Sequence, residues 1–317
     1  MAKEVIFEGI EEYLEPYFPY FRRVEGSQLA RCYLTGLIMD GERKSVEPMS
    51  ERVHASERGM QRLLTEVKWD HEAVGCEYRH RMLNLTSDPQ GILAIDDTGF
   101  PKKGKESICV ARQYCGTLGK VANCQVGVSM TYVGQGVAWP YEMELYVPQS
   151  WDSEEDADCL KRREKTRMPD TAHYREKWQM ALDLVDRARW EGVPHRAVVA
   201  DSWYGMIPDF RRGLAKRGEW YVVGIRSDME VFLEAPLWAE PEKGKPQRGR
   251  PRKYPKMVET NPPPVKVCQI GATIEEGAWE QLVLRQGSRK KPLMVEAVAL
   301  RVWPAQGHRI GAVPEET

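Results

Sequence analysis

One short stretch constrains the fold more than any other: the apolar run Ile92–Ile95, which leads directly into two adjacent acids, Asp96 and Asp97. The surrounding segment, Gly91–Gly104, reads GILAIDDTGFPKKG. An apolar run this short, bounded by Gly and Pro, predicts a buried strand rather than a helix. Carboxylates at the end of a buried strand are costly unless something neutralises them. Two explanations remain open: an Asx turn at Asp97 that leads into Gly99, or a divalent metal.

A second carboxylate, Asp201, ends another predicted buried strand, Arg196–Asp201, which reads RAVVAD. Between the two acids, period-two and helical patterns predict two strands and then an amphipathic helix. The predicted elements are the strands Val121–Tyr132 and Gly136–Tyr146, a helix face from Tyr174 to Ala188, the helix Ile207–Lys216 and the strand Trp220–Ile225. Three meandering strands followed by strand, helix and strand predict an RNase H-like α/β fold with a mixed five-stranded sheet.

The predicted topology places Asp97 beside Asp201, because the first and fourth strands of an RNase H-like sheet are adjacent and parallel. Two neighbouring carboxylates can hold a divalent cation, which relieves both their repulsion and the cost of their burial. Oxygen ligands without a nearby His or Cys favour Mg²⁺ or Mn²⁺ over zinc. The sequence therefore predicts Asp97 and Asp201 as the ligands of a shared metal site.

Composition bounds the class of protein. The chain has 317 residues, of which 42% are hydrophobic, and this suits two domains or one large domain with an appendage. No apolar run approaches the ~18 residues of a membrane span, and the acidic N-terminus lacks the layout of a signal peptide. Seven scattered cysteines form no Cys-x-x-Cys and predict neither a disulfide framework nor a zinc site. We expect a cytoplasmic protein without a membrane partner.

Changes in character along the chain predict three segments. Residues 1–88 form a helical domain that is a candidate for DNA binding, and 89–226 form the first part of the RNase H-like core. Residues 227–317 form a basic linker and a β-rich insertion, which we expect to be incomplete. The strand-like runs of that insertion are Val265–Ile270, Ala278–Arg285 and Leu293–Val302. An acidic tract within the core, Asp152–Asp158, is expected to be a solvated loop rather than a metal cluster.

The helical segment contains two short predicted helices, Val46–Val53 and Glu57–Val67, with Ser56 as a plausible N-cap. Such a pair resembles a helix-turn-helix, whose second helix would present an exposed face to DNA. That face would carry Arg58, Gln61 and Arg62. Plain helical packing remains the alternative.

Basic residues gather in two further places, although the net charge of the whole chain is only −1. The tract Lys243–Lys256 contains no acid, and its central RGRPRK resembles an AT-hook, a segment whose arginines lie in a narrow A·T minor groove. Its candidate DNA contacts are Arg248, Arg250, Arg252 and Lys253. Lys102, Lys103 and Lys105 follow Asp97 and would either steer phosphate towards the metal or merely solvate a loop. For the tract, the alternative is a flexible, solvated loop.

Several motifs resemble those of insertion-sequence transposases of the DDE superfamily endonuclease group. They read IDDTGFPKKGKESICVARQYCGTLGKVANCQVGVS, VVADSWYG and WYVVGIRSD, and the resemblance extends over roughly residues 10 to 315. It implies that Asp97, rather than Asp96, is the first catalytic metal ligand and that Asp201 is the second. It also implies two Mg²⁺ ions, cleavage of transposon ends, joining of the freed 3′-hydroxyl to target DNA, and a homodimer that pairs two ends.

The sequence departs from the family pattern at the third catalytic carboxylate, a Glu on a helix beyond the β-rich insertion. Glu176 lies before Asp201, and no predicted buried helix carries the other candidate acids, Glu275, Glu276, Glu315 and Glu316. We therefore expect a truncated transposase with impaired activity or none. Two alternatives remain open: a non-catalytic DNA-binding inhibitor of the full enzyme, and an RNase H-like nuclease that does not join strands.

Overall fold

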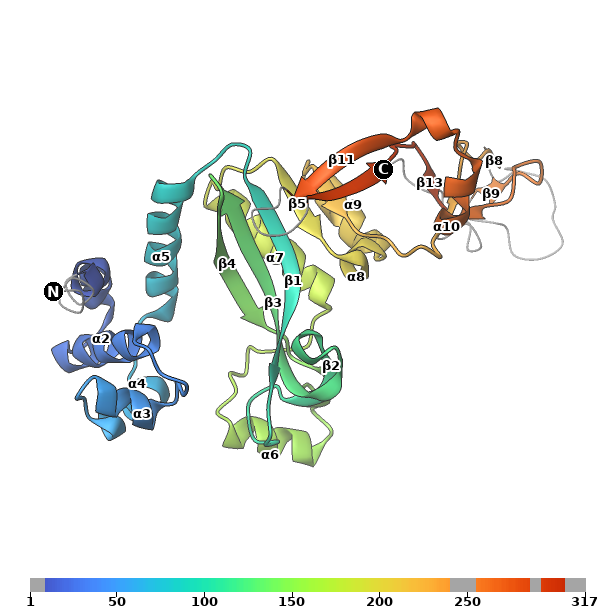
Figure 1. Ribbon diagram of the computed structural model, residues 1–317. Coiled ribbons are helices and arrows are strands. Elements are labelled where there is room, and N and C mark those ends of the chain that lie inside the picture. The colour runs from blue at the N-terminus through green and yellow to red at the C-terminus, as the bar shows by residue number, and fades with distance from the viewer. Residues whose placement is uncertain (1–8, 240–254, 286–291, 306–317) are drawn as a thin grey trace. The chain divides into compact units, whose positions relative to one another are not determined.

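A computed structural model describes residues 9–239, 255–285 and 292–305 (Figure 1). The chain divides into two compact units, each assembled from separate segments. The first comprises Met1–Ile92, Met130–Met143 and Arg187–Arg196, and the second comprises the rest. Within the described ranges, no helix is both long and apolar enough to cross a bilayer. The domain limits expected at residues 88 and 226 stay a prediction.

The first unit is built mainly from helices. They are η1 (Glu15–Tyr20), α2 (Val24–Ile38), α3 (Val46–Arg52), α4 (Glu57–Thr65) and α5 (His71–Thr86). Helix α2 packs against both α3 and α4, and Met60 and Leu63 are the buried residues of α4. The N-cap predicted at Ser56 is confirmed, because its hydroxyl oxygen accepts a hydrogen bond from the Gly59 N–H at 3.1 Å.

The central sheet has the strand order β2-β3-β1-β5-β6, and β4 also pairs with β3 (Figure 1). Its strands are β1 (Ile92–Pro101), β2 (Ala111–Cys115), β3 (Lys120–Gly134), β4 (Val137–Leu145), β5 (Ala197–Ala200) and β6 (Tyr221–Val223). The adjacency of the first predicted strand, β1, and the fourth, β5, is confirmed, and β5 pairs with β6 in parallel. This is the predicted RNase H-like sheet with one strand more, β2, which extends the antiparallel pairing of β3.

The first strand is longer than the sequence suggested. We expected it to end at the Asp pair, but β1 continues through Asp97 to Pro101, so the Asx turn is wrong. Gly99 is not a break; it is a point of close approach, since a Cβ there would lie 2.7 Å from the Cys115 Sγ. The missing side chain lets the chain after β2 pack directly against β1, and Thr117 donates a 2.7 Å hydrogen bond to the Gly99 carbonyl.

The hairpin between β3 and β4 turns where expected. Its two central residues, Gln135 and Gly136, both have positive φ angles, 49° and 76°, as a two-residue hairpin turn requires.

The acidic tract Asp152–Asp158 is more than the solvated loop that the sequence suggested. Asp156 caps the helix α6 (Ala157–Lys165) by accepting a hydrogen bond from the Asp158 N–H at 2.9 Å, so part of the tract serves a helix start.

Three helices complete the elements around the sheet: α7 (Lys177–Trp190), α8 (Ser202–Gly205) and α9 (Pro208–Lys216). The 3-10 turns η2 (Gly116–Leu118) and η3 (Gln149–Trp151) lie in its connections. The amphipathic face predicted for α7 is confirmed, because Ala181, Val185 and Ala188 are fully buried. Trp151 is also fully buried and donates a hydrogen bond to the Val110 carbonyl at 2.8 Å.

The C-terminal region forms small sheets. Its strands are β7 (Glu230–Phe232), β8 (Trp238–Ala239), β9 (Lys256–Met257), β10 (Val265–Lys266), β11 (Glu280–Arg285), β12 (Leu293–Ala297) and β13 (Trp303–Pro304), with the short helical turns α10 (Val267–Ile270), η4 (Gly271–Thr273) and η5 (Glu276–Ala278). The strand predicted over Val265–Ile270 is wrong in its second half, where Ile270 packs as part of α10 against Met229 and Val231. The strand predicted over Leu293–Val302 ends at Ala297.

Candidate active site

Asp97 lies on β1, on the same side of the strand as the buried Leu93 and Ile95. Both of its carboxylate oxygens are engaged. The Tyr204 hydroxyl donates to Oδ1 at 2.6 Å, and the Lys177 ammonium lies 2.5 Å from Oδ2. The side chain stays 27% exposed, so the carboxylate is accessible from solvent as well as held by its neighbours.

Asp201 directly follows β5 and is the N-cap residue of α8. Its Oδ1 accepts hydrogen bonds from the N–H groups of Trp203 at 2.9 Å and Tyr204 at 3.3 Å. The cap is held in place by close backbone packing, because a Cβ on Gly205 would lie only 1.8 Å from the Gly224 carbonyl oxygen. Glycine at this point lets α8 rest directly on the end of β6.

Tyr204 therefore contacts both carboxylates, through its hydroxyl to Asp97 and its backbone N–H to Asp201. The residue is 1% exposed, and its ring packs against Trp203 and Phe210 at centroid distances of 4.9 and 5.3 Å. Burial, and then the negative charges of Asp97, Asp201 and Asp96, raise the pKa of Tyr204 well above its ordinary value. The hydroxyl stays protonated, as the donor to Asp97 must be.

Lys177, the first residue of α7, supplies the positive charge of the site. Its ammonium lies 5.2 Å from the ring centroid of Tyr146 and 5.3 Å from that of Trp203, so two aromatic faces flank the ion pair with Asp97. Burial, and then the charges of Glu176 and Asp97, raise the pKa of Tyr146. Neither Lys177 nor Tyr204 was predicted from the sequence; the available signal was a cation opening an amphipathic helix and an aromatic pair one residue beyond Asp201.

Asp96 has a different environment. Its side chain is exposed, its Oδ1 accepts from the Asp97 N–H at 2.7 Å, and its carbonyl accepts from the Ser129 hydroxyl at 3.0 Å. Asp97 is the member of the pair that Tyr204 and Lys177 contact. The donor chemistry of Asp97 and Asp201, hard carboxylate oxygens beside one buried tyrosine, fits Mg²⁺ or Mn²⁺. In the part of the chain that the structure describes, no three His, Cys, Asp or Glu side chains gather closely enough to hold a metal.

Comparison with known proteins decides the family. Residues 16–291 match the model of a family described as DDE superfamily endonuclease. The chain belongs to this family. It is also 30% identical over 226 residues to the probable transposase for insertion sequence element IS701 of Microchaete diplosiphon, and the alignment covers 71% of this chain and 55% of that protein. The chain thus spans about half the length of the curated relative that it matches.

Four of the other predicted site residues of this DDE superfamily endonuclease are exposed on the described part of the chain. Lys102 and Lys103 are exposed just after β1, where the backbone continues from Asp97. Arg58 is exposed on α4, and Arg62 on the same helix forms an exposed pair with Glu66 at 2.9 Å. The tract that contains Arg248, Arg250, Arg252 and Lys253 lies outside the described residues.

The remaining acids do not complete the pair. Glu176 is exposed and accepts a hydrogen bond from the Tyr174 hydroxyl at 2.6 Å, which raises the pKa of Tyr174 to about 12. Glu275 and Glu276 lie in an exposed turn of the C-terminal region, and Glu315 and Glu316 lie outside the described residues. Among the described acids, Asp97 and Asp201 are the two that Tyr204 links.

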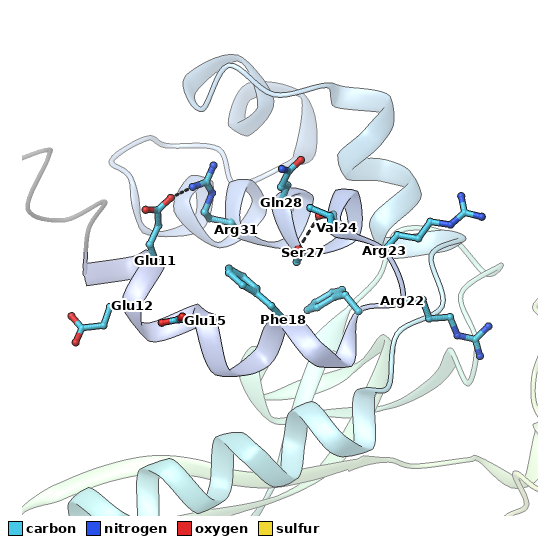
Figure 2. A pocket seen from close by; sticks show the side chains of 11 residues that line it. Glu11, Glu12, Glu15, Phe18, Arg22, Arg23, Val24, Ser27, Gln28 and Arg31 are labelled. Atoms are coloured by element: carbon cyan, nitrogen blue, oxygen red, sulfur yellow. Dashed lines mark hydrogen bonds and ion pairs between the residues drawn. The ribbon is translucent and has the colours of Figure 1, made fainter.

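A separate pocket of about 680 Å³ lies in the first unit, between η1 and α2 (Figure 2). Three acids at and before the start of η1 line it, together with two arginines that precede α2 and one from the middle of that helix. These residues are Glu11, Glu12 and Glu15, and Arg22, Arg23 and Arg31. Glu11 and Arg31 pair with each other. The pocket therefore carries both charges, and none of its lining residues belongs to the carboxylate site.

Proposed function

We propose that this endonuclease is a DNA transposase that cleaves transposon ends and joins the freed 3′-hydroxyl to target DNA. The observation that carries the proposal is that Tyr204 contacts the carboxylates of both Asp97 and Asp201. Membership of the family, and similarity to a probable transposase, support the same function.

In this proposal Asp97 and Asp201 hold Mg²⁺ or Mn²⁺, two ions in the complete site. When bound, such ions would lower the pKa of the attacking water and stabilise the leaving oxygen of the phosphodiester. The protein's own residues orient the ligands. Tyr204 fixes Oδ1 of Asp97 with its hydroxyl, and the N–H groups at the start of α8 fix Oδ1 of Asp201.

DNA would be bound through its phosphates. The proposed contacts are Lys102 and Lys103 just after β1, Arg58 and Arg62 on α4, and Arg248, Arg250, Arg252 and Lys253 in the basic tract. Cationic side chains that displace condensed counterions dominate affinity for DNA. Transposition requires two ends to be held together, which favours a homodimer.

We also propose that Asp97 and Asp201 alone support little or no cleavage. Two carboxylates can hold one metal ion, but a clamp on both the attacking and the leaving oxygen calls for a further acidic ligand. Among the described residues, no third acid joins them. Residual cleavage should therefore be slow and depend on both aspartates.

The test is nicking of DNA that carries the ends of the element, at high protein concentration with Mg²⁺ or Mn²⁺. Asp97→Asn and Asp201→Asn should reduce nicking to background, whereas Asp96→Asn, at the exposed neighbour, should retain it. Nicking that survives both substitutions would contradict the proposal. Nicking without joining would favour the nuclease, and DNA binding without nicking would favour the inhibitor.

A further inference from the structure

Lys177 stands at an unfavourable place in its helix. It is the first residue of α7, where the unpaired backbone N–H groups give the helix a partial positive charge and a cation is disfavoured. Helix stability therefore does not explain a lysine here. The reason for its position must lie in what the side chain contacts.

The contacts form a built position for one cation. The ammonium meets Oδ2 of Asp97 at 2.5 Å, and the rings of Tyr146 and Trp203 flank it at 5.2 and 5.3 Å. The Lys177 side chain is only 18% exposed. Partial removal from water strengthens both the ion pair and the attraction to the rings.

From this geometry we infer that the Lys177 ammonium is the resident cation of Asp97 in the metal-free protein, and that a divalent ion must displace it. The inference rests on the proposed function, in which Asp97 is a metal ligand. If both cations touched Oδ2, the 2.5 Å contact and a Mg–O distance of about 2.1 Å would place them at most about 4.6 Å apart. Repulsion at that separation, in a partly buried site, favours one cation over the other.

Lys177 is therefore a positioning residue that acts through Asp97. It keeps the carboxylate neutralised and oriented before the metal arrives, and it sets the affinity for the metal by competing for the same oxygen. The rings of Tyr146 and Trp203 hold the ammonium in its paired position, so they strengthen the competitor of the metal.

The test is calorimetric titration of Mg²⁺ into the full chain and its variants. Lys177→Met should tighten the Mg²⁺ Kd by roughly tenfold, because the competitor is gone. Lys120→Met removes the same charge from an exposed position at the start of β3 and should change the Kd less than twofold. Trp203→Leu keeps the charge but removes one ring, and should tighten Mg²⁺ binding in the same direction by a smaller factor.

Two further readouts report the exchange itself. Mg²⁺ should raise the thermal midpoint more in Lys177→Met than in the wild type, since stabilisation by a ligand grows as its Kd falls. The ¹⁵N signal of the Lys177 ammonium, assigned by its absence from the variant, should shift when Mg²⁺ saturates the wild type. An unchanged signal, or equal Kd values for the wild type, Lys177→Met and Trp203→Leu, would overturn the inference.

The same titrations distinguish failure of the proposed function from failure of the competition by Lys177. If Asp97→Asn binds Mg²⁺ as tightly as the wild type does, Asp97 is not a metal ligand and both ideas fall. If Asp97→Asn loses Mg²⁺ binding while Lys177→Met leaves the Kd unchanged, only the competition by Lys177 is refuted.

Discussion

At the scale of single residues, Tyr204 organises the site. A buried hydroxyl needs a partner, and this one finds it in Oδ1 of Asp97 at 2.6 Å. Because the same residue gives its backbone N–H to Asp201, the position of one carboxylate depends on the position of the other. A phenol is well suited to this task, because its raised pKa keeps the hydroxyl protonated, and therefore a donor, at neutral pH.

We predict that Tyr204→Phe lowers the free energy of unfolding of the metal-free protein by about 1–2 kcal/mol. A hydrogen bond to a charged group contributes about 1.5–3 kcal/mol, and the partial exposure of Asp97 reduces this value. The ring contacts with Trp203 and Phe210 are kept. Urea unfolding measures the change.

The matched control is Tyr174→Phe, which removes a hydroxyl with an equally short bond to the exposed Glu176. It should cost less than about 0.5 kcal/mol, because solvent screens exposed partners. Equal losses of unfolding free energy in the two variants would show that the hydrogen bond between Tyr204 and Asp97 stabilises the protein no more than an exposed one does.

The residues of the site differ in how far the sequence reveals them. Asp97 and Asp201 could be singled out because each interrupts or follows an apolar run whose strand character is local. Lys177 and Tyr204 could not, because their partner, Asp97, lies 80 and 107 positions away. Such contacts depend on how α7 and α8 pack on the sheet, and no periodicity in the sequence encodes that packing.

At the scale of elements, the joint between α8 and β6 sets the position of Asp201. Gly205 and Gly224 face each other so closely that no side chain fits between them. A short helix that rests directly on a strand end has little freedom to tilt. Its first N–H groups therefore stay aimed at the capping carboxylate.

We predict that Gly205→Ala destabilises the protein by about 1–3 kcal/mol or more, which is the usual cost of overpacking. The contact partner is a backbone carbonyl, which cannot rotate away as a side chain can. Thermal unfolding measures the loss, and Mg²⁺ titration should show weaker binding because α8 shifts with Asp201.

Gly104→Ala is the control for this substitution, because nothing lies within 4 Å of a Cβ at that position. It should leave both the thermal midpoint and the Mg²⁺ affinity unchanged. If Gly205→Ala behaved in the same way, α8 would not be held by the glycine contact.

The elements show where local patterns succeed and where they fail. The strands β3 and β4 and the helix α7 have clear periodicity and were predicted close to their observed bounds. The end of β1 was misjudged because Gly99 reads as a break, although its role is close packing against Cys115. Helix α6 was missed because the capping acids before it look like a solvated loop until Asp156 is seen to accept the Asp158 N–H.

At the scale of the molecule, the chain forms two compact units and passes between them several times. The strand order of the sheet was predictable because few topologies connect such a succession of strands and helices. The ion-pair network that holds the first unit together could not be predicted from the sequence. Arg79 on α5 is 4% exposed and bonds Glu142 on β4 and Glu191 just beyond α7. Such a buried charge is tolerated because both partners reach it.

The last prediction concerns the acid stability of that network. Burial by itself would raise the pKa of Glu191, but the hydrogen bonds from Arg79 and Tyr141 outweigh it and hold the pKa below its ordinary value of 4.5. A carboxyl whose pKa is lowered by folding contributes stability above its unfolded pKa. That contribution is lost as pH falls through the lower pKa of the folded state.

Glu191→Gln should therefore lower the free energy of unfolding at pH 7 by about 2–4 kcal/mol, somewhat less than full loss of a buried partner, because Glu142 still pairs with Arg79. Below about pH 4.5 the difference between variant and wild type should narrow, because Glu191 then takes up a proton in the unfolded chain before it does so in the folded protein. Urea unfolding from pH 7 to pH 3.5 measures both values. Glu154→Gln, at an exposed acid, should have the same free energy of unfolding as the wild type at every pH. A difference for Glu191→Gln that stays constant with pH would mean that packing of the side chain, rather than its charge, supports Arg79.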